Sequence, residues 1–223
     1  KSSCDIEKGS EHWSNYRNLK NMALKQFKPY TKSTRSTILI DRSGLWKGKP
    51  YKPLTSVNKS VKGRNNMGRI TARNHGGGHK QKYRIIDFYR KKFDVSGLVE
   101  RIEYDPNRSC HIMLIKFEDG DRSYYLAPQK IKVGDKVQNG PNSEIKVGNA
   151  LPLKDIPVGI DIHNVEIQPG AGGKIARAAG AHVTISGSDG NYSIIKMTSG
   201  EIRKIDSRCL ATIGVLSNPD QKN

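Results

Sequence analysis

The net charge of this chain is concentrated in one window, between Lys20 and Lys92. The window holds 20 Lys or Arg and only two acidic residues, so its charge of +18 equals that of the whole chain. Such a block repels itself and attracts polyanions, so we expect an arm or rim that becomes ordered against phosphate groups. Few long apolar runs occur in the first ninety residues. The hydrophobic core is therefore predicted in the second half of the chain.

A disordered solubility tail and a membrane-surface segment are the two alternatives for the basic window. Amphipathic membrane helices place large apolar residues opposite Lys at helical spacing, whereas Pro29, Pro50, Pro53 and several glycines interrupt this window. No apolar run approaches the roughly 20 residues that span a bilayer, so we expect no membrane partner. The three cysteines show no C-x-x-C spacing. This pattern argues against a disulfide framework or a cysteine zinc site and favours a reducing compartment.

The chain changes character near Tyr83. From Lys20 to about Lys82 it has breakers and charge without a sustained period, so we expect it to be extended, irregular and dependent on a partner for order. Beyond that point, short runs of β-branched and aromatic residues predict strands, and Asp119-Gly120 is the signature of a type I′ hairpin turn. About five strands in some sixty residues indicate a small closed barrel. The predicted strands are 83–88, 96–104, 111–117, 123–126 and 132–137.

A second set of strands begins near Ile145. The segment 160–167 alternates polar and apolar residues, which predicts a half-buried strand. Asp189-Gly190 and Ser199-Gly200 separate the later runs, a pattern typical of an antiparallel meander and hence of a second barrel. Helix is sparse, with one predicted turn around 175–179. The later strands are predicted at 181–186, 192–197 and 201–205, and the linker between the barrels at 138–144.

The most specific segment is Gly63–Lys80, in which three consecutive glycines lie among cations. Glycines let the backbone approach a sugar-phosphate surface and aim its N–H groups at it, and Arg can fork onto phosphate or stack on an unpaired base. Asn and His side chains can bind base edges and 2′-hydroxyls. A flexible basic linker is the simpler alternative. The candidate RNA-binding residues are Arg64, Asn65, Arg69, Arg73, His75, Gly76, Gly77, Gly78, His79, Lys80, Lys82 and Arg84.

Neither a metal site nor a catalytic site is expected. His75 and His79 are four residues apart, a spacing that joins two zinc ligands on a helix, but the intervening glycines disfavour a helix and no third ligand is near. His163 could act as a base, although a histidine inside an alternating strand is usually structural. No serine lies in a G-x-S-x-G context. An enzyme is therefore not predicted.

A second glycine-rich element spans 169–180. Ile175 follows Lys174 where a Walker A motif requires Ser or Thr, and it also replaces the third glycine of G-x-G-x-x-G. A nest of backbone N–H groups edged by Lys174 and Arg177 could still hold an RNA phosphate. A long connection that needs glycines in order to turn accounts for the element equally well. Arg108, after the turn 105–107, should project from a barrel rim, where an arginine is more often solvated than functional.

Taken together, these motifs resemble the L-two family of large-subunit ribosomal proteins. Several independent motifs agree, and the similarity runs from about Met22 to Gln221, nearly the whole chain. The segments that carry it are 63–80, 83–88, 102–109, 156–159, 163–166 and 169–180.

The resemblance implies a mostly β fold, with an oligonucleotide-binding (OB) barrel followed by an SH3-like barrel and an extended basic N-terminal arm. It implies packing on large-subunit ribosomal RNA near the peptidyl transferase region, neighbouring ribosomal proteins as partners, and support of subunit assembly and association. Arg108 and Arg177 match family arginines that contact RNA, and the His75–His79 loop would also lie against RNA. No cofactor is implied, although structural magnesium ions bound with the ribosomal RNA are compatible with it. The expected parts are an N-terminal extension at 1–21, a basic arm at 22–62, an OB barrel at 63–138 and an SH3-like barrel at 145–218.

The resemblance also raises expectations about the rest of the ribosome. Family members continue for roughly a third of their length beyond this point, into a basic extension, and we expect a separate chain, as from a split gene, to supply it. The motifs resemble the bacterial branch, and with the extra leading residues they lead us to expect a mitochondrial ribosome in the matrix, with the bacterial cytoplasm as the alternative. The alternative function is a free-standing RNA-binding chaperone with an OB barrel.

Overall fold

The computed structural model describes residues 24–57 and 62–222. These residues form short strands joined by turns, and their helical elements are 3₁₀ turns such as Lys52–Leu54 and Leu153–Asp155. The predicted extension at 1–21 lies outside them. Within the described ranges the buried hydrophobic side chains begin at Ile86, and nearly all follow Val99. This confirms that most of the basic window contributes no core.

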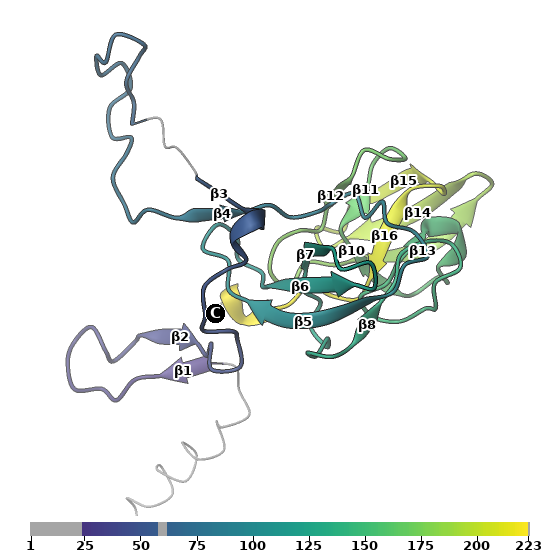
Figure 1. The fold of residues 1–223 in the computed structure, drawn as a ribbon, viewed down its shortest axis with the longest axis horizontal. Helices are drawn as coiled ribbons and strands as arrows, with labels where there is room; N and C mark the ends of the chain where they lie inside the picture. The colour runs from purple at the N-terminus through teal and green to yellow at the C-terminus, as the bar shows by residue number, and fades with distance from the viewer. Residues whose placement is uncertain (1–23, 58–61, 223) are drawn as a thin grey trace, which may run out of the picture. The chain divides into compact units, whose positions relative to one another are not determined.

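The first barrel contains a four-stranded antiparallel sheet in the order β7-β6-β5-β8 (Figure 1). Successive side chains of a strand point to opposite faces, so Ile112 and Leu114 join one core cluster while Met113 and Ile115 join another. Because both faces of β6 are buried, apolar residues occupy successive positions along this strand. Four of the five strands predicted for this barrel form this sheet, and the one predicted at 132–137 is shorter than expected. They are β5 (Gly97–Glu103), β6 (Ile112–Phe117), β7 (Arg122–Leu126) and β8 (Lys136–Val137).

The turn between β6 and β7 is not the predicted type I′ turn. A type I′ turn needs positive φ at both central residues, but here Gly120 has a φ of 89° and Asp119 does not adopt a positive φ. The Gly120 N–H donates to the Phe117 oxygen at 3.0 Å, and the Phe117 N–H donates to the Asp121 oxygen at 2.9 Å. These bonds define a three-residue loop closed by a left-handed glycine. The ammonium of Lys92 binds the carboxylates of Asp119 and Asp121 across this wider loop.

The second barrel contains a six-stranded sheet in the order β15-β14-β13-β10-β16-β9. Its meander of three strands is confirmed, with β-branched residues such as Ile185 and Ile195 directed into the core. The three- and four-residue strands β9 and β16 were not predicted, because runs this short carry no clear period. The strands are β9 (Ala150–Pro152), β10 (Asp161–His163), β13 (Val183–Asp189), β14 (Tyr192–Met197), β15 (Ile202–Asp206) and β16 (Leu210–Ile213).

The predicted strand at 160–167 is interrupted at Asn164, whose φ is 50°. The chain turns there out of β10 and into β11 (Val165–Glu166), which pairs with β12 (Gly173–Ile175). Every side chain from 162 to 166 is buried, so the alternation does not mark a half-exposed strand. The predicted helical turn at 175–179 is also wrong, because 173–175 is a strand and Ala176 has a φ of 53°.

Part of the basic window is more regular than predicted. Within the separate unit that ends at Gly44, β1 (Leu24–Gln26) pairs with β2 (Ile38–Ile40). Farther along, β3 (Thr55–Val57) pairs with β4 (Lys82–Arg84). The expectation of an irregular chain up to residue 82 is therefore wrong in β1, β2 and β3. The strand predicted at 83–88 is present only as β4, which ends at Arg84. Backbone pairing orders them even though their side chains remain largely exposed.

The segment that precedes β3 belongs to the body of the first barrel. The Trp46 N–H donates to the Ile102 oxygen at 2.8 Å, and the Tyr51 N–H donates to the Tyr124 hydroxyl at 2.9 Å. The side chains of Tyr51 and Leu54 pack against the core cluster that contains Tyr124. Residues 45–54 therefore cover the barrel and add to its core.

The two barrels form one body because they share a core and a hydrogen-bonded seam. Ala179 and Leu216 of the second barrel lie in the same buried cluster as residues of β6 and β7. Across the seam, the Ser217 N–H donates to the Ala127 oxygen at 3.1 Å. The predicted linker is also bound to the second barrel, because the Gly140 N–H donates to the Ala150 oxygen at 2.9 Å. Residues 45–221 consequently make a single compact unit.

Candidate nucleic-acid interface

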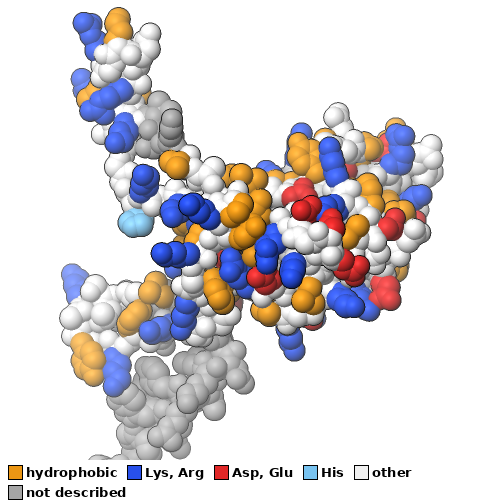
Figure 2. All heavy atoms as spheres, in the orientation of Figure 1, with side chains coloured by type: hydrophobic (Ala, Val, Ile, Leu, Met, Phe, Trp, Pro, Cys, Tyr) orange, Lys and Arg blue, Asp and Glu red, His pale blue; other side chains and the backbone are white. Residues whose placement is uncertain are grey.

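The longest exposed cationic segment of the described residues is the connection between β3 and β4, which runs beyond the ends of both strands (Figure 1). In Figure 2, Lys and Arg side chains dominate this connection, whereas the acidic side chains seen in that view lie on the barrels. The predicted RNA ligands of its described part are all exposed, as a polyanion surface requires. They are Arg64, Asn65, Arg69, Arg73, His75, Gly76, Gly77, Gly78, His79, Lys80 and Lys82.

A small hairpin forms the first part of this connection, and Asn65 organises it. Arg64 bridges to Ile70, and the Asn65 N–H donates to the Arg69 oxygen at 2.9 Å. The Asn65 side-chain oxygen accepts hydrogen bonds from the N–H groups of Met67 at 3.1 Å and Arg69 at 2.9 Å. This oxygen holds the protein's own backbone, so Asn65 shapes the loop that presents Arg64 and Arg69.

The three consecutive glycines follow a path that other residues rarely adopt. Gly76, Gly77 and Gly78 have φ angles of 108°, 79° and 78°. A Cβ atom at Gly77 or Gly78 would meet no protein atom within 4 Å. Gly77 and Gly78 are therefore required by backbone conformation rather than by protein packing and leave an open backbone surface, whereas a Cβ atom at Gly76 would also lie 3.2 Å from Cβ and Cγ of Lys62.

Arg84 differs from the rest of the predicted set because it is half-buried at the end of β4. One of its Nη atoms donates to the Lys82 oxygen at 3.0 Å, and its Nε is buried without a hydrogen-bond partner. The nearby turn is bound to the same strand, because the Asn107 amide donates to the Lys82 oxygen at 2.9 Å. The base of the cationic loop is thus fixed to the turn that carries Arg108.

Arg108 is held in place rather than freely solvated. Its Nε donates to Asp105 Oδ2 at 2.8 Å, and an Nη donates to the Tyr83 hydroxyl at 3.3 Å. Its guanidinium also lies 5.5 Å from the ring centroid of Phe88. Asp105 is completely buried. The rim arginine is therefore the partner of a buried carboxylate, and its side chain is 17% exposed.

Arg177 comes from the second barrel and meets the same aromatic ring. Its guanidinium lies 4.7 Å from the centroid of Phe88, and its side chain is exposed. The Cys110 thiol donates to the Arg177 carbonyl oxygen at 3.4 Å, which fixes the backbone. The structure thus brings Arg108 and Arg177 together at the seam of the barrels. Spacing along the chain did not predict this pairing.

The second glycine-rich element does not leave an open nest. The N–H groups of Gly170 and Gly172 donate to the two carboxylate oxygens of Glu166, at 3.1 and 3.0 Å. The Leu210 N–H donates to the same carboxylate at 3.1 Å. Because this buried side chain occupies the N–H groups, the structure favours the alternative of a long connection that needs glycines in order to turn over that of a phosphate nest. Lys174, in contrast, is exposed on β12 and stays available to a ligand.

Sequence reasoning missed Glu166 as an internal anion and Arg90 as an internal cation. Arg90 lies in the basic window, but it is 3% exposed and donates to Asn139 Oδ1 at 3.2 Å and to the Gly148 oxygen at 2.7 Å. Its guanidinium lies 4.1 Å from the ring centroid of Tyr125. Burial lowers the pKa of Arg90, whereas the nearby Tyr125 and Asp87 act in the opposite direction and raise it. The alternating pattern of 160–167 placed Glu166 at a polar position, so the sequence carried no signal of its burial.

His163 is structural rather than a base. It is fully buried, and its Nδ1–H donates to the Gly214 oxygen at 2.6 Å. Burial lowers its pKa to about 3, so it is neutral at physiological pH. His75 and His79 are exposed. In ranges 24–57 and 62–222, no three His, Cys, Asp or Glu side chains gather in a way that could hold a metal ion.

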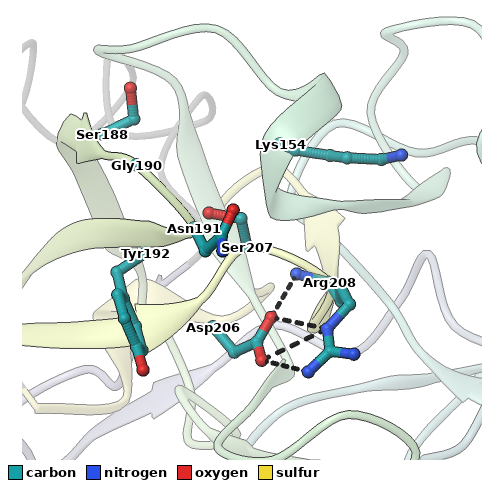
Figure 3. A pocket seen from close by; sticks show the side chains of 8 residues that line it. All are labelled: Lys154, Ser188, Gly190, Asn191, Tyr192, Asp206, Ser207 and Arg208. Carbon is teal, nitrogen blue, oxygen red and sulfur yellow. Dashed lines mark hydrogen bonds and ion pairs between the residues drawn. The ribbon is translucent and has the colours of Figure 1, made fainter.

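An open pocket of about 670 Å³ lies on the second barrel (Figure 3). Arg208 is engaged with Asp206 at 2.7 Å, and this pair lowers the pKa of Asp206 to about 2. In Figure 3 the Lys154 side chain extends away from that pair. The lining therefore supplies hydrogen-bonding groups without a coupled acid and base. The lining residues are Lys154, Ser188, Gly190, Asn191, Tyr192, Asp206, Ser207 and Arg208.

Comparison with protein families covers most of the chain. Residues 51–139 match the model for the RNA binding N-terminal domain of Ribosomal Proteins L2, and residues 146–223 match the model for the C-terminal domain of the same proteins. The chain belongs to the L2 family of ribosomal proteins. The expected resemblance and the fold of an OB barrel followed by an SH3-like barrel are confirmed.

Individual L2 proteins of bacteria are similar over 91% of the chain. The large ribosomal subunit protein uL2 of Pelagibacter ubique is 76% identical over 203 residues, which are 72% of that protein. The uL2 proteins of Granulibacter bethesdensis and Rickettsia bellii are 58% and 55% identical over 202 residues, and these cover 73% and 74% of their lengths. L2 is a structural ribosomal protein and not an enzyme. No helix in the described part of this L2 chain is long and apolar enough to cross a membrane.

Proposed function

We propose that this chain is a structural constituent of the large ribosomal subunit that binds large-subunit ribosomal RNA near the peptidyl transferase region and supports subunit assembly and association. The observation that carries the proposal is that the exposed cations of the β3–β4 connection are fixed at its base to the cations of the barrel seam. Asn107 ties β4 to the turn that holds Arg108, and Phe88 joins Arg108 to Arg177. Cations fixed on rigid barrels position an RNA, whereas those on the loop add charge.

Membership of the L2 family supports the same function, because its N-terminal model is described as RNA binding. The ligands proposed for the loop are the exposed cations and the open glycine backbone, with Asn65 shaping the loop. At the barrels they are Arg108, Lys174 and Arg177. Neighbouring ribosomal proteins are expected partners, and magnesium is expected only as ions bound with the RNA.

Sedimentation tests this function. The tagged chain is expected to remain with large subunits through a high-salt wash. Binding through phosphate contacts alone weakens steeply as salt rises, so retention would mean that the chain is built into the subunit rather than held by charge alone. Chemical footprinting of the RNA should then show protection near the peptidyl transferase region. Recovery only in light fractions would instead favour the free-standing RNA chaperone.

Two finer expectations remain predictions. Similarity to bacterial uL2 proteins supports a ribosome of bacterial type, and fractionation of the source cells decides between the mitochondrial matrix and the bacterial cytoplasm. Mass spectrometry of purified large subunits tests the separate chain. Peptides of an L2-type basic extension should come from a distinct polypeptide, and an intact mass that includes the extension in this chain would refute the idea.

A further inference from the structure

Tyr89 is an exposed aromatic residue in the middle of the cationic seam. Its side chain is 49% exposed, although the residues before and after it are fixed by a hydrogen bond and by burial. The Tyr89 N–H donates to Asp87 Oδ1 at 2.8 Å, and the Phe88 oxygen accepts a hydrogen bond from the Gly173 N–H at 3.0 Å. Arg90, the next residue, is buried. The backbone that carries the Tyr89 ring is therefore fixed.

The ring itself rests on the second glycine-rich element. A Cβ atom at Gly172 would lie 3.2 Å from both Cδ1 and Cε1 of Tyr89, so the absence of a side chain lets the ring approach the backbone closely. Gly172 has a φ of 76°, and its N–H is bound to the buried carboxylate of Glu166. The support beneath the ring is thus as rigid as its own backbone.

One cation lies against this ring, and others belong to neighbouring residues. The Lys91 ammonium lies 5.0 Å from its centroid, and Lys174 is exposed two residues beyond Gly172. Arg108 and Arg177 lie over the ring of Phe88, the preceding residue. An aromatic face bordered by positive charge matches a nucleotide, which offers a flat base and a phosphate. An apolar protein partner would have no use for these cations.

We propose that Tyr89 is a stacking platform for one unpaired base of the ribosomal RNA, with Lys91 and Lys174 binding the adjoining phosphates. The proposal rests on the function proposed above. The Lys91 ammonium is carried on a flexible stem, so it can turn from the ring to a phosphate as the base stacks. Stacking on tyrosine tolerates any base, because every base has a π face. The site therefore selects an unpaired nucleotide rather than a sequence.

Fluorescence of a short single-stranded oligoadenylate that carries aminopurine, an adenine analogue quenched by stacking, tests the proposal with the full chain. A base-paired RNA hairpin is the second probe. Tyr89→Ala should lose most of the quenching and bind the single strand roughly tenfold more weakly, with unchanged binding of the hairpin. Tyr89→Phe and Tyr89→Trp should retain quenching. Tyr192→Ala is the matched control, since Tyr192 is 52% exposed but lies beside an arginine already paired with Asp206.

The outcomes separate the two proposals. If the wild type and Tyr89→Ala bind and quench the single strand equally, the stacking site is refuted and RNA binding stands. If the wild type binds neither probe, RNA binding and stacking are both refuted. Ultraviolet irradiation of purified large subunits provides the second measurement. An RNA adduct on the peptide that contains Tyr89 supports the site, whereas a crosslink from Tyr89 to a neighbouring protein overturns it.

Discussion

Arg108 and Arg177 belong to different barrels, yet both place a guanidinium over the ring of Phe88, at 5.5 and 4.7 Å from its centroid. They differ in what else they hold. Arg108 binds the buried carboxylate of Asp105, whereas Arg177 is exposed at the surface. Removing Arg108 should therefore lower the free energy of unfolding more than removing Arg177, although both are cations at the same seam.

Replacing these arginines should separate folding from RNA binding. Arg177→Ala is expected to weaken RNA binding by about 1–3 kcal/mol with little change in stability, because it removes a charged hydrogen-bond donor from the surface. Arg108→Ala should weaken binding and also destabilise the fold by about 1–3 kcal/mol, because Asp105 loses a charged partner. Filter binding and thermal unfolding of both variants measure the two effects. Equal loss of stability in the two variants would contradict the assignment.

Glu166 should be essential to the second barrel. Glu166→Ala leaves the N–H groups of Gly170, Gly172 and Leu210 without their acceptor, so we expect a loss of roughly 2–4 kcal/mol of unfolding free energy. Glu166→Gln keeps one acceptor oxygen and should lose less. Denaturant unfolding ranks the three proteins. If all three unfold at the same denaturant concentration, the carboxylate does not organise this loop.

The buried His163 predicts a loss of stability in acid. Its pKa is about 3 when folded and 6.5 when exposed, so between these values the unfolded chain binds the proton more readily. Stability attributable to His163 is therefore complete above about pH 6.5 and falls as the pH is lowered, on the order of 3 kcal/mol by pH 4. Unfolding of the wild type and His163→Gln across this range measures it. The variant should show a shallower acid dependence, and identical slopes would exclude the histidine as the cause.

Charge on the β3–β4 connection should govern the salt dependence of binding. Each phosphate contact that is lost reduces the slope of log affinity against log salt by about 0.7–0.9. Replacing Arg64, Arg69 and Arg73 together with Gln should therefore lower the slope by about 2–3 without changing thermal stability, since all three are exposed. Filter binding over a salt series tests this. Arg203→Gln, an exposed arginine on β15, is the control and should leave the slope unchanged.

Two deletions locate the start of the folded body. Removing residues 1–44 should preserve the main thermal transition, because residues 45–221 form their own unit. Removing residues 1–57 should lower the midpoint, since Tyr51 and Leu54 pack on the core and the Tyr51 N–H binds Tyr124. Calorimetry distinguishes them. Identical midpoints would mean that residues 45–57 add no stability.

The local signals in the sequence were sufficient for most of the sheet framework. Strands such as Ile112–Phe117 contain runs of β-branched and apolar residues, and turns with glycine separate several of them. The strands and the turns can therefore be predicted without a structure. Where the backbone leaves the regular pattern, the prediction failed. Asn164 and Ala176 adopt positive φ directly after β10 and β12, and the Asn164 N–H donates to the Ala176 oxygen at 3.1 Å. This contact joins residues twelve apart, so a local pattern does not reveal it.

The chemistry of this protein is readable from its residues alone: a basic window with a charge of +18 that suits a polyanion, followed by charge-balanced β barrels. Charge and strand propensity are properties of residues and their near neighbours, so they can be read along the chain. Which groups remain free to bind depends on the packed fold. It turns Arg90 inward, fills the second glycine-rich loop with Glu166, and sets Arg177 beside Arg108 at Phe88. These contacts join residues far apart in sequence, and their energies depend on burial, which only the packed fold defines.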